Sequence, residues 1–128
     1  MFGRKIKKVG IVCNDAGSAN LIVQWVKNYK YKYLLKMQGP AKKIFKRTLP
    51  NLSTDTKLQN LIKNSDIIIT GTSNISTIEN RTRILAIKNK KKVIAVMDHW
   101  VLYKEGLIYK GKIILPVEVW VANKKSLI

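Results

Sequence analysis

Small polar and ionisable residues follow directly after the short apolar runs of this sequence. The runs and the clusters after them are residues 6–13 with 14–18, 33–37 with 38–40, 66–70 with 71–73, and 93–97 with 98–100. If the runs are parallel strands, all four clusters lie at one edge of one sheet. Ligands of open α/β sheets bind at the carboxyl ends of the strands. The spacing therefore predicts a binding site at that edge.

The first cluster offers backbone groups to a ligand. Asp15, Gly17 and Ser18 join the first run to a helical pattern. Small residues let backbone N–H groups approach a ligand, and a helix N-terminus favours a phosphate or carboxylate. We expect these three residues to bind substrate, although the cluster matches neither the Walker A nor the three-glycine dinucleotide motif. A tight turn with a capped helix is the alternative interpretation.

The cluster at 71–73 carries hydroxyl groups. We expect Gly71, Thr72 and Ser73 to bind a sugar or phosphate oxygen of the substrate, with a simple helix cap as the alternative. Glu79 follows in the next helical segment and is one of only seven acidic residues. It is a candidate general base, and an ion pair with a nearby arginine or lysine is the alternative.

The cluster at 98–100 contains the only histidine, His99, beside Asp98. A neighbouring carboxylate orients an imidazole and raises its pKa, which suits acid–base catalysis, so we predict Asp98 and His99 as catalytic residues. Adjacent residues of an extended strand point to opposite sides, which leaves their mutual contact open. Trp100 and Tyr103 are expected to stack on a sugar ring or base, or else to pack locally. One histidine and one distant cysteine lack metal-ligand spacing, so we expect no metal and no cofactor.

Alternating strand and helix patterns must position these clusters. Strands are expected at 5–13, 31–37, 66–70, 93–97 and 117–122, a small hairpin at 107–109 and 112–115, and helices at 16–27, from 39 onward, at 54–64 and at 77–89. This order predicts a single α/β domain over residues 1–128. It is expected to be a three-layer, Rossmann-like domain with a mainly parallel five-stranded sheet, in the order 2-1-3-4-5, and helices on both faces.

Composition narrows the class of protein. The formal net charge is +18, from 25 Lys and Arg against seven Asp and Glu. Most of the basic residues are lysine, whereas specific nucleic-acid contacts favour arginine, so nucleic acid is kept as a less favoured partner. No membrane span and no signal peptide are expected, and one cysteine fits the cytoplasm. Cys13 is expected to be a buried apolar residue rather than a nucleophile.

Several short motifs together resemble a known family. They are residues 15–19, 39–41, 65–73 and 98–100, with Tyr103. They resemble the N-terminal Rossmann-like half of GT-B glycosyltransferase-type proteins of bacterial polysaccharide biosynthesis, an architecture shared by UDP-N-acetylglucosamine 2-epimerases and lipid-A-disaccharide synthases. The resemblance implies that Asp15, Gly17, Ser73, Asp98 and His99 line a cleft. It also implies that turnover needs a second Rossmann-like domain, supplied by another chain or by a homodimer.

Three functions remain open at this stage. The first is a sugar-processing domain of surface-glycan biosynthesis that binds a nucleotide sugar or a glycan acceptor, with Asp98 or His99 as the base. The second is a non-catalytic module that binds nucleotides or phosphorylated metabolites at the same edge. The third is a basic nucleic-acid-binding protein.

Overall fold

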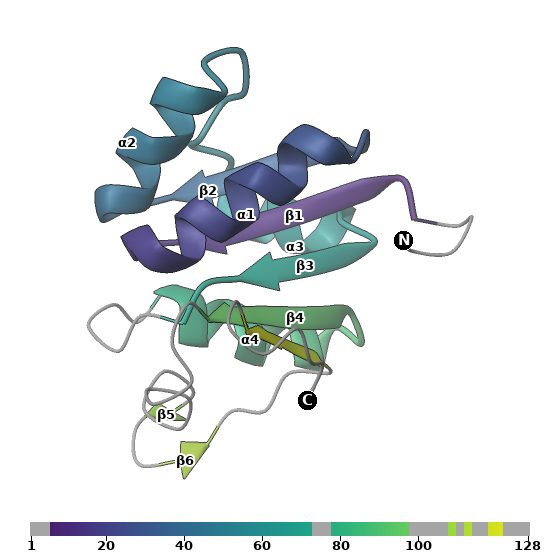
Figure 1. Cartoon of the computed structure of the whole chain (residues 1–128). Helices are drawn as coiled ribbons and strands as arrows, with labels where there is room; N and C mark the ends of the chain where they lie inside the picture. The colour runs from purple at the N-terminus through teal and green to yellow at the C-terminus, as the bar shows by residue number, and fades with distance from the viewer. Residues whose placement is uncertain (1–5, 73–77, 98–107, 110–111, 114–117, 122–128) are drawn as a thin grey trace.

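The computed structural model describes residues 6–72, 78–97, 108–109, 112–113 and 118–121 (Figure 1). Strands and helices alternate along the chain. They are β1 (Lys8–Cys13), α1 (Ala16–Asn28), β2 (Lys32–Met37), α2 (Gly39–Thr48), α3 (Leu58–Asn64), β3 (Ile67–Thr70), α4 (Ile78–Lys88), β4 (Lys92–Met97), β5 (Ile108–Tyr109), β6 (Lys112–Ile113) and β7 (Glu118–Val121). The protein is therefore of the α/β class, as expected from the sequence.

The main sheet is parallel, and its strands lie in the order β2-β1-β3-β4-β7. Cys13 at the end of β1 is in register with Met37 at the end of β2, and Val12 is in register with Thr70 at the end of β3. The strand ends that carry the polar clusters therefore share one edge of the sheet. The short β5 and β6 strands pair antiparallel, as the hairpin prediction required.

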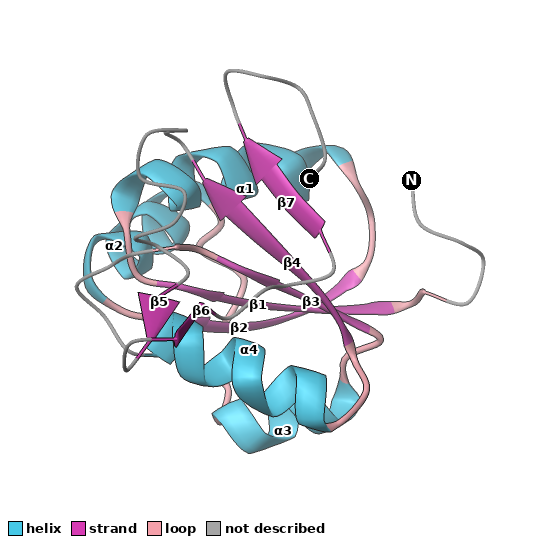
Figure 2. Cartoon of the chain, turned by 90° about the horizontal axis from the view of Figure 1, so that it is seen from below, coloured by secondary structure: helices cyan, strands magenta, loops and turns pink. Residues whose placement is uncertain are grey.

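Helices cover the two faces of the sheet. Figure 2 shows α1 and α2 on one face and α3 and α4 on the other. The isoleucines of β3 show why helices lie on both faces of the sheet, because these side chains alternate between two apolar clusters. Ile67 and Ile69 pack with α1 and α2, whereas Ile68 packs with residues of α3 and α4. A strand that is buried on both faces reads as a continuous apolar run.

One helix begins later than predicted. The sequence suggested a helix from residue 54, but α3 begins at Leu58. The preceding residues are extended along the outer edge of β2. The Thr54 carbonyl accepts the Met37 N–H at 2.9 Å, and the Thr56 N–H donates to the Leu35 carbonyl at 2.9 Å. The Thr56 N–H, which a first helical turn would leave unpaired, gains a partner in this way, and so do two backbone groups at the edge of β2. The edge contact therefore overrides the local helix signal.

None of the helices within the described ranges is both long enough and apolar enough to cross a bilayer. The longest, α1, has 13 residues.

Asp66, at the opposite edge of the sheet, makes hydrogen bonds whose contribution to stability depends on pH. Its Oδ2 accepts the N–H groups of Lys7 and Lys8, each at 2.9 Å, and these bonds lower the pKa of the carboxyl. A lowered pKa in the folded state stabilises the protein above the unfolded value of about 3.9, and this stabilisation disappears as the pH falls through the folded pKa.

We therefore expect wild type to be more stable than Asp66→Asn at neutral pH, with the difference shrinking below about pH 4. Urea unfolding followed by circular dichroism, for both proteins from pH 7 downward, measures this. A difference that stays constant over the whole range would contradict the assignment.

Candidate functional site

The loops at the carboxyl edge are fastened to one another through backbone hydrogen bonds. The Gly71 N–H donates to the Val12 carbonyl at 3.0 Å, which fixes the loop after β3 beside the end of β1. On the other side of β1, the Gln38 N–H donates to the Cys13 carbonyl at 3.0 Å. The β1–α1 loop therefore lies between the loops that follow β2 and β3.

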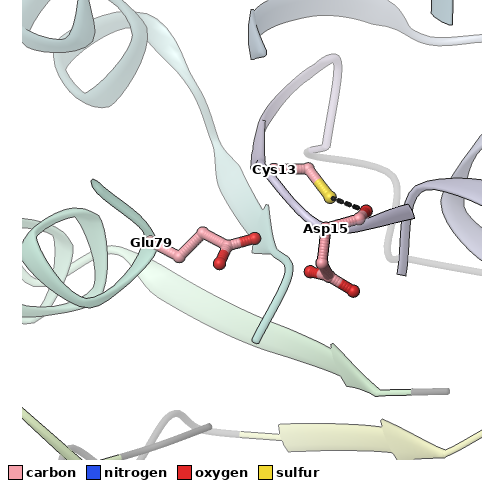
Figure 3. Close-up of side chains that lie close together, drawn as sticks. All are labelled: Cys13, Asp15 and Glu79. Atoms are coloured by element: carbon pink, nitrogen blue, oxygen red, sulfur yellow. Dashed lines mark hydrogen bonds between the residues drawn. The ribbon is translucent and has the colours of Figure 1, made fainter. Parts of the chain in front are cut away.

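Three ionisable side chains converge beneath these loops (Figure 3). The donor atoms of Cys13, Asp15 and Glu79 all lie within 4.8 Å of one another. Gly71 faces all three, because a Cβ on this residue would overlap Glu79 Oε2 and would lie 2.7 Å from Asp15 Oδ1 and 2.8 Å from Cys13 Sγ. Only glycine allows the backbone after β3 to pass this close to the cluster.

Glu79 holds the β1–α1 loop in place. Its side chain is fully buried, and Oε2 accepts the Asn14 N–H at 2.9 Å. A carboxylate in this position satisfies a loop donor that the sheet leaves without a partner. The structure therefore gives Glu79 a positioning contact, and its predicted role as a general base stays a prediction.

Arg83, one turn further along α4, holds the neighbouring loop. Its Nη1 donates to Thr70 Oγ1 at 2.9 Å and to the Gly71 carbonyl at 2.8 Å, and Nη2 donates to Asn80 Oδ1. Burial lowers the pKa of Arg83 to about 10, while the charge of Glu79 acts in the opposite direction. The guanidinium therefore stays charged at neutral pH and compensates the buried carboxylate.

The two carboxylate oxygens of Asp15 have different surroundings. Its Oδ2 caps α1 by accepting the Ser18 N–H at 2.8 Å, as the capping prediction allowed. Its Oδ1 is covered by protein and has no hydrogen-bond partner among the residues that the structure describes. Because most buried polar atoms are hydrogen-bonded, this oxygen is the clearest point at which a ligand donor could bind.

Two residues that were predicted to bind substrate, Ser18 and Thr72, have their hydroxyl groups engaged within the protein. Ser18 Oγ donates to the Val96 carbonyl at 2.7 Å, and Thr72 Oγ1 donates to the same carbonyl at 3.0 Å. Both bonds tie the edge loops to β4. If Ser18 or Thr72 donated to a substrate through these hydroxyls, the hydrogen bond to Val96 would have to be replaced, whereas their oxygens can still accept. Gly17 lies in the first turn of α1 and is half-buried.

Cys13 is fully buried, as predicted, and burial together with the charges of Glu79 and Asp15 raises the pKa of its thiol well above the ordinary value. The thiol donates weakly to the Asp15 carbonyl at 3.6 Å. The thiol and the two carboxylates could together hold a divalent cation. The spacing of these three residues in the sequence did not indicate that they would meet. A cation there would have to displace the thiol proton, because metals bind the thiolate.

We expect Cys13 to react with a water-soluble disulfide reagent only when the protein unfolds. The thiolate is the reactive species, and both its burial and its raised pKa suppress it in the native state. Colour release by Ellman's reagent should be slow in buffer and complete in denaturing urea. Rapid native labelling would show that the carboxyl edge opens to solvent.

Five predicted site residues lie outside the described residues: Ser73, Asp98, His99, Trp100 and Tyr103. Of the predicted residues that are described, Asp15, Gly71 and Glu79 lie in one cluster, and Ser18 and Thr72 meet at the Val96 carbonyl. The catalytic roles of Asp98 and His99 stay predictions.

The polar side chains of α4 are buried more deeply than we expected from the sequence. Glu79, Thr82, Arg83 and Ala86 are all fully buried. Their spacing of three, one and three residues places them on one face of a helix. This spacing in the sequence could have indicated the buried face. A helix that turns an acid and a base four residues apart toward a sheet indicates a buried polar contact.

No family model, no curated protein and no solved structure matches this chain.

Proposed function

We propose that this protein is a sugar-processing domain of surface-glycan biosynthesis, which binds a nucleotide sugar or a glycan acceptor at the carboxyl edge of its sheet. Turnover requires a second Rossmann-like domain, from another chain or from a second copy. Asp98 or His99 acts as the base that activates an acceptor hydroxyl.

The observation that supports this function is Oδ1 of Asp15, which lies among the converging loops and has no hydrogen-bond partner in the described part of the chain. Carboxylate oxygens only accept hydrogen bonds, so the group that Asp15 can bind must be a donor. Arg83 compensates the charge of Glu79, so the carboxylate of Asp15 leaves this part of the edge acidic, which favours the hydroxyl groups of a sugar over a phosphate. The sugar is therefore expected to lie over the β1–α1 loop, and any phosphate to lie away from the two carboxylates.

The proposal treats the chain as a three-layer, Rossmann-like domain with five core strands in the order 2-1-3-4-5, equivalent to the N-terminal half of a GT-B architecture. The parallel pairing of β4 with β7 supports this order. We further propose that the domain acts in the cytoplasm, where nucleotide sugars are available and a single unpaired cysteine is stable.

Binding is tested by saturation-transfer and ¹⁵N-correlation NMR with UDP-sugars and acceptor glycans. We expect shifts at residues 14–17 and 71–72. We also expect Asp15→Asn to bind at least tenfold more weakly, because an amide is a poorer acceptor than a carboxylate. Asp66→Asn is the matched control, since it removes a carboxylate at the opposite edge of the sheet. Sugars that leave both loops unshifted would refute the proposal.

A non-catalytic binding module is the second candidate, and the contact of Glu79 favours it. Its buried Oε2 already accepts the Asn14 N–H, so this carboxylate is poorly placed to take a proton from a substrate. Asp98→Asn and His99→Gln distinguish the two functions. Unchanged binding in both variants, with no turnover in wild type supplied with a partner domain, would favour the binding module over the enzyme.

A further inference from the structure

A surface cavity of about 530 Å³, wide open to solvent, lies away from the carboxyl edge, between the end of α1, the start of β2 and the connection from α2 to α3. Its lining residues are Val26, Lys27, Tyr29, Lys30, Tyr31, Tyr33, Thr48, Leu49, Pro50, Asn51 and Leu52. The volume falls in the range of about 300–1,000 Å³ that is typical of small-molecule sites. We call this cavity the tyrosine pocket.

Aromatic rings form one wall of the tyrosine pocket, and Trp25 holds them together. The Trp25 ring stacks on Tyr31 with centroids 6.0 Å apart and an interplanar angle of 11°, and it lies 5.1 Å from Tyr29. Tyr31 and Tyr33 meet edge to face at 6.3 Å. These mutual contacts fix the rings in place, and Tyr29 is still 37% exposed. The wall therefore offers a preorganised aromatic surface to a flat ligand.

The charge of the tyrosine pocket is positive. Lys27 and Lys30 line it, both exposed, and its described lining includes no acidic side chain. The hydroxyl of Tyr33 donates to the Tyr29 carbonyl, and burial raises the pKa of Tyr33 to about 12, so the phenol adds no negative charge near neutral pH. The pocket therefore complements an anion that also carries an aromatic ring.

We propose that the tyrosine pocket binds a nucleoside monophosphate. The base stacks on the exposed ring of Tyr29, and the phosphate lies between the ammonium groups of Lys27 and Lys30. The side-chain amide of Asn51, which can both donate and accept, meets the polar edge of the base. This site is separate from the sugar site proposed at the carboxyl edge and does not depend on it.

The test uses the full chain, with uridine and adenosine monophosphates as probes at millimolar concentration. ¹⁵N-correlation NMR should show saturable shifts at Tyr29, Lys30 and Asn51. Tyr29→Ala should weaken binding about tenfold, whereas Tyr29→Phe, which keeps the ring, should stay within roughly twofold of wild type.

Replacing Lys27 and Lys30 together by Gln should weaken binding and flatten its salt dependence. The matched control replaces two exposed lysines on the other face, Lys63 and Lys88, by Gln, and should leave the affinity unchanged.

Several results would overturn the proposal. One is the absence of saturable shifts with either nucleotide. Another is nucleotide binding that Asp15→Asn abolishes and the Lys27/Lys30 double variant retains, because the ligand would then occupy the carboxyl edge. Much tighter, Tyr29-dependent binding of a single-stranded oligonucleotide would make nucleic acid the partner instead. Tyr29-dependent association with anionic lipid vesicles, with nucleotides inert, would assign the pocket to a membrane surface.

Discussion

Arg83→Ala is expected to lower the free energy of unfolding by about 3–5 kcal/mol, because it leaves a buried carboxylate without its compensating charge. Arg83 is fully buried, and its Nη1 alone bonds both Thr70 Oγ1 and the Gly71 carbonyl. Removing the guanidinium takes the Nη1 donor away from these two acceptors and removes the positive charge that compensates Glu79. Urea unfolding followed by circular dichroism measures the loss, and a midpoint shift with an unchanged slope would show that stability alone has changed.

Two comparisons make the Arg83 result specific. Arg81→Ala changes an exposed arginine of the same helix and should alter stability by no more than about 0.5 kcal/mol. Glu79→Gln combined with Arg83→Met removes both charges and should be less destabilised than Arg83→Ala. If Arg83→Ala loses less than about 1 kcal/mol, the guanidinium does not have the role that its contacts indicate.

Gly71→Ala is expected to destabilise the fold by about 1–3 kcal/mol and to abolish ligand binding at the carboxyl edge. The new methyl group would overlap Glu79 Oε2 and press on Asp15 Oδ1 and Cys13 Sγ. Relief of the overlap requires either the carboxylates or the loop after β3 to move. The expected result is therefore a folded protein with altered amide shifts at Asn14, Asp15 and Thr72.

Gly17→Ala is the matched control for Gly71→Ala. Gly17 lies within α1, where alanine is a better helix former than glycine, so this substitution should raise stability by up to about 1 kcal/mol. Opposite signs for the two glycines would establish that Gly71 is needed for close approach. A neutral Gly71→Ala would mean that the cluster has room that the structure does not show.

The position of the site at one edge of the sheet could be predicted from the sequence, whereas most of the hydrogen bonds within the site could not. Apolar runs that end in polar clusters were enough to place Asp15, Gly71 and Thr72 at one edge, because parallel strands align their carboxyl ends. The pairing of the Ser18 and Thr72 hydroxyls with the Val96 carbonyl could not be predicted, since it depends on how α1 and β4 meet in space. The late start of α3 had the same cause, because residues 54–56 bond to β2, which is distant in sequence.

The segment beside β2 has a consequence for how the molecule meets others. A strand at the end of a sheet normally exposes a row of unpaired amides and carbonyls, onto which a foreign strand can add. Here the Leu35 carbonyl and the Met37 amide are already occupied by Thr56 and Thr54. A strand of another molecule could pair with β2 only after residues 54–56 were displaced. This segment therefore opposes fibre growth at the β2 edge of the sheet.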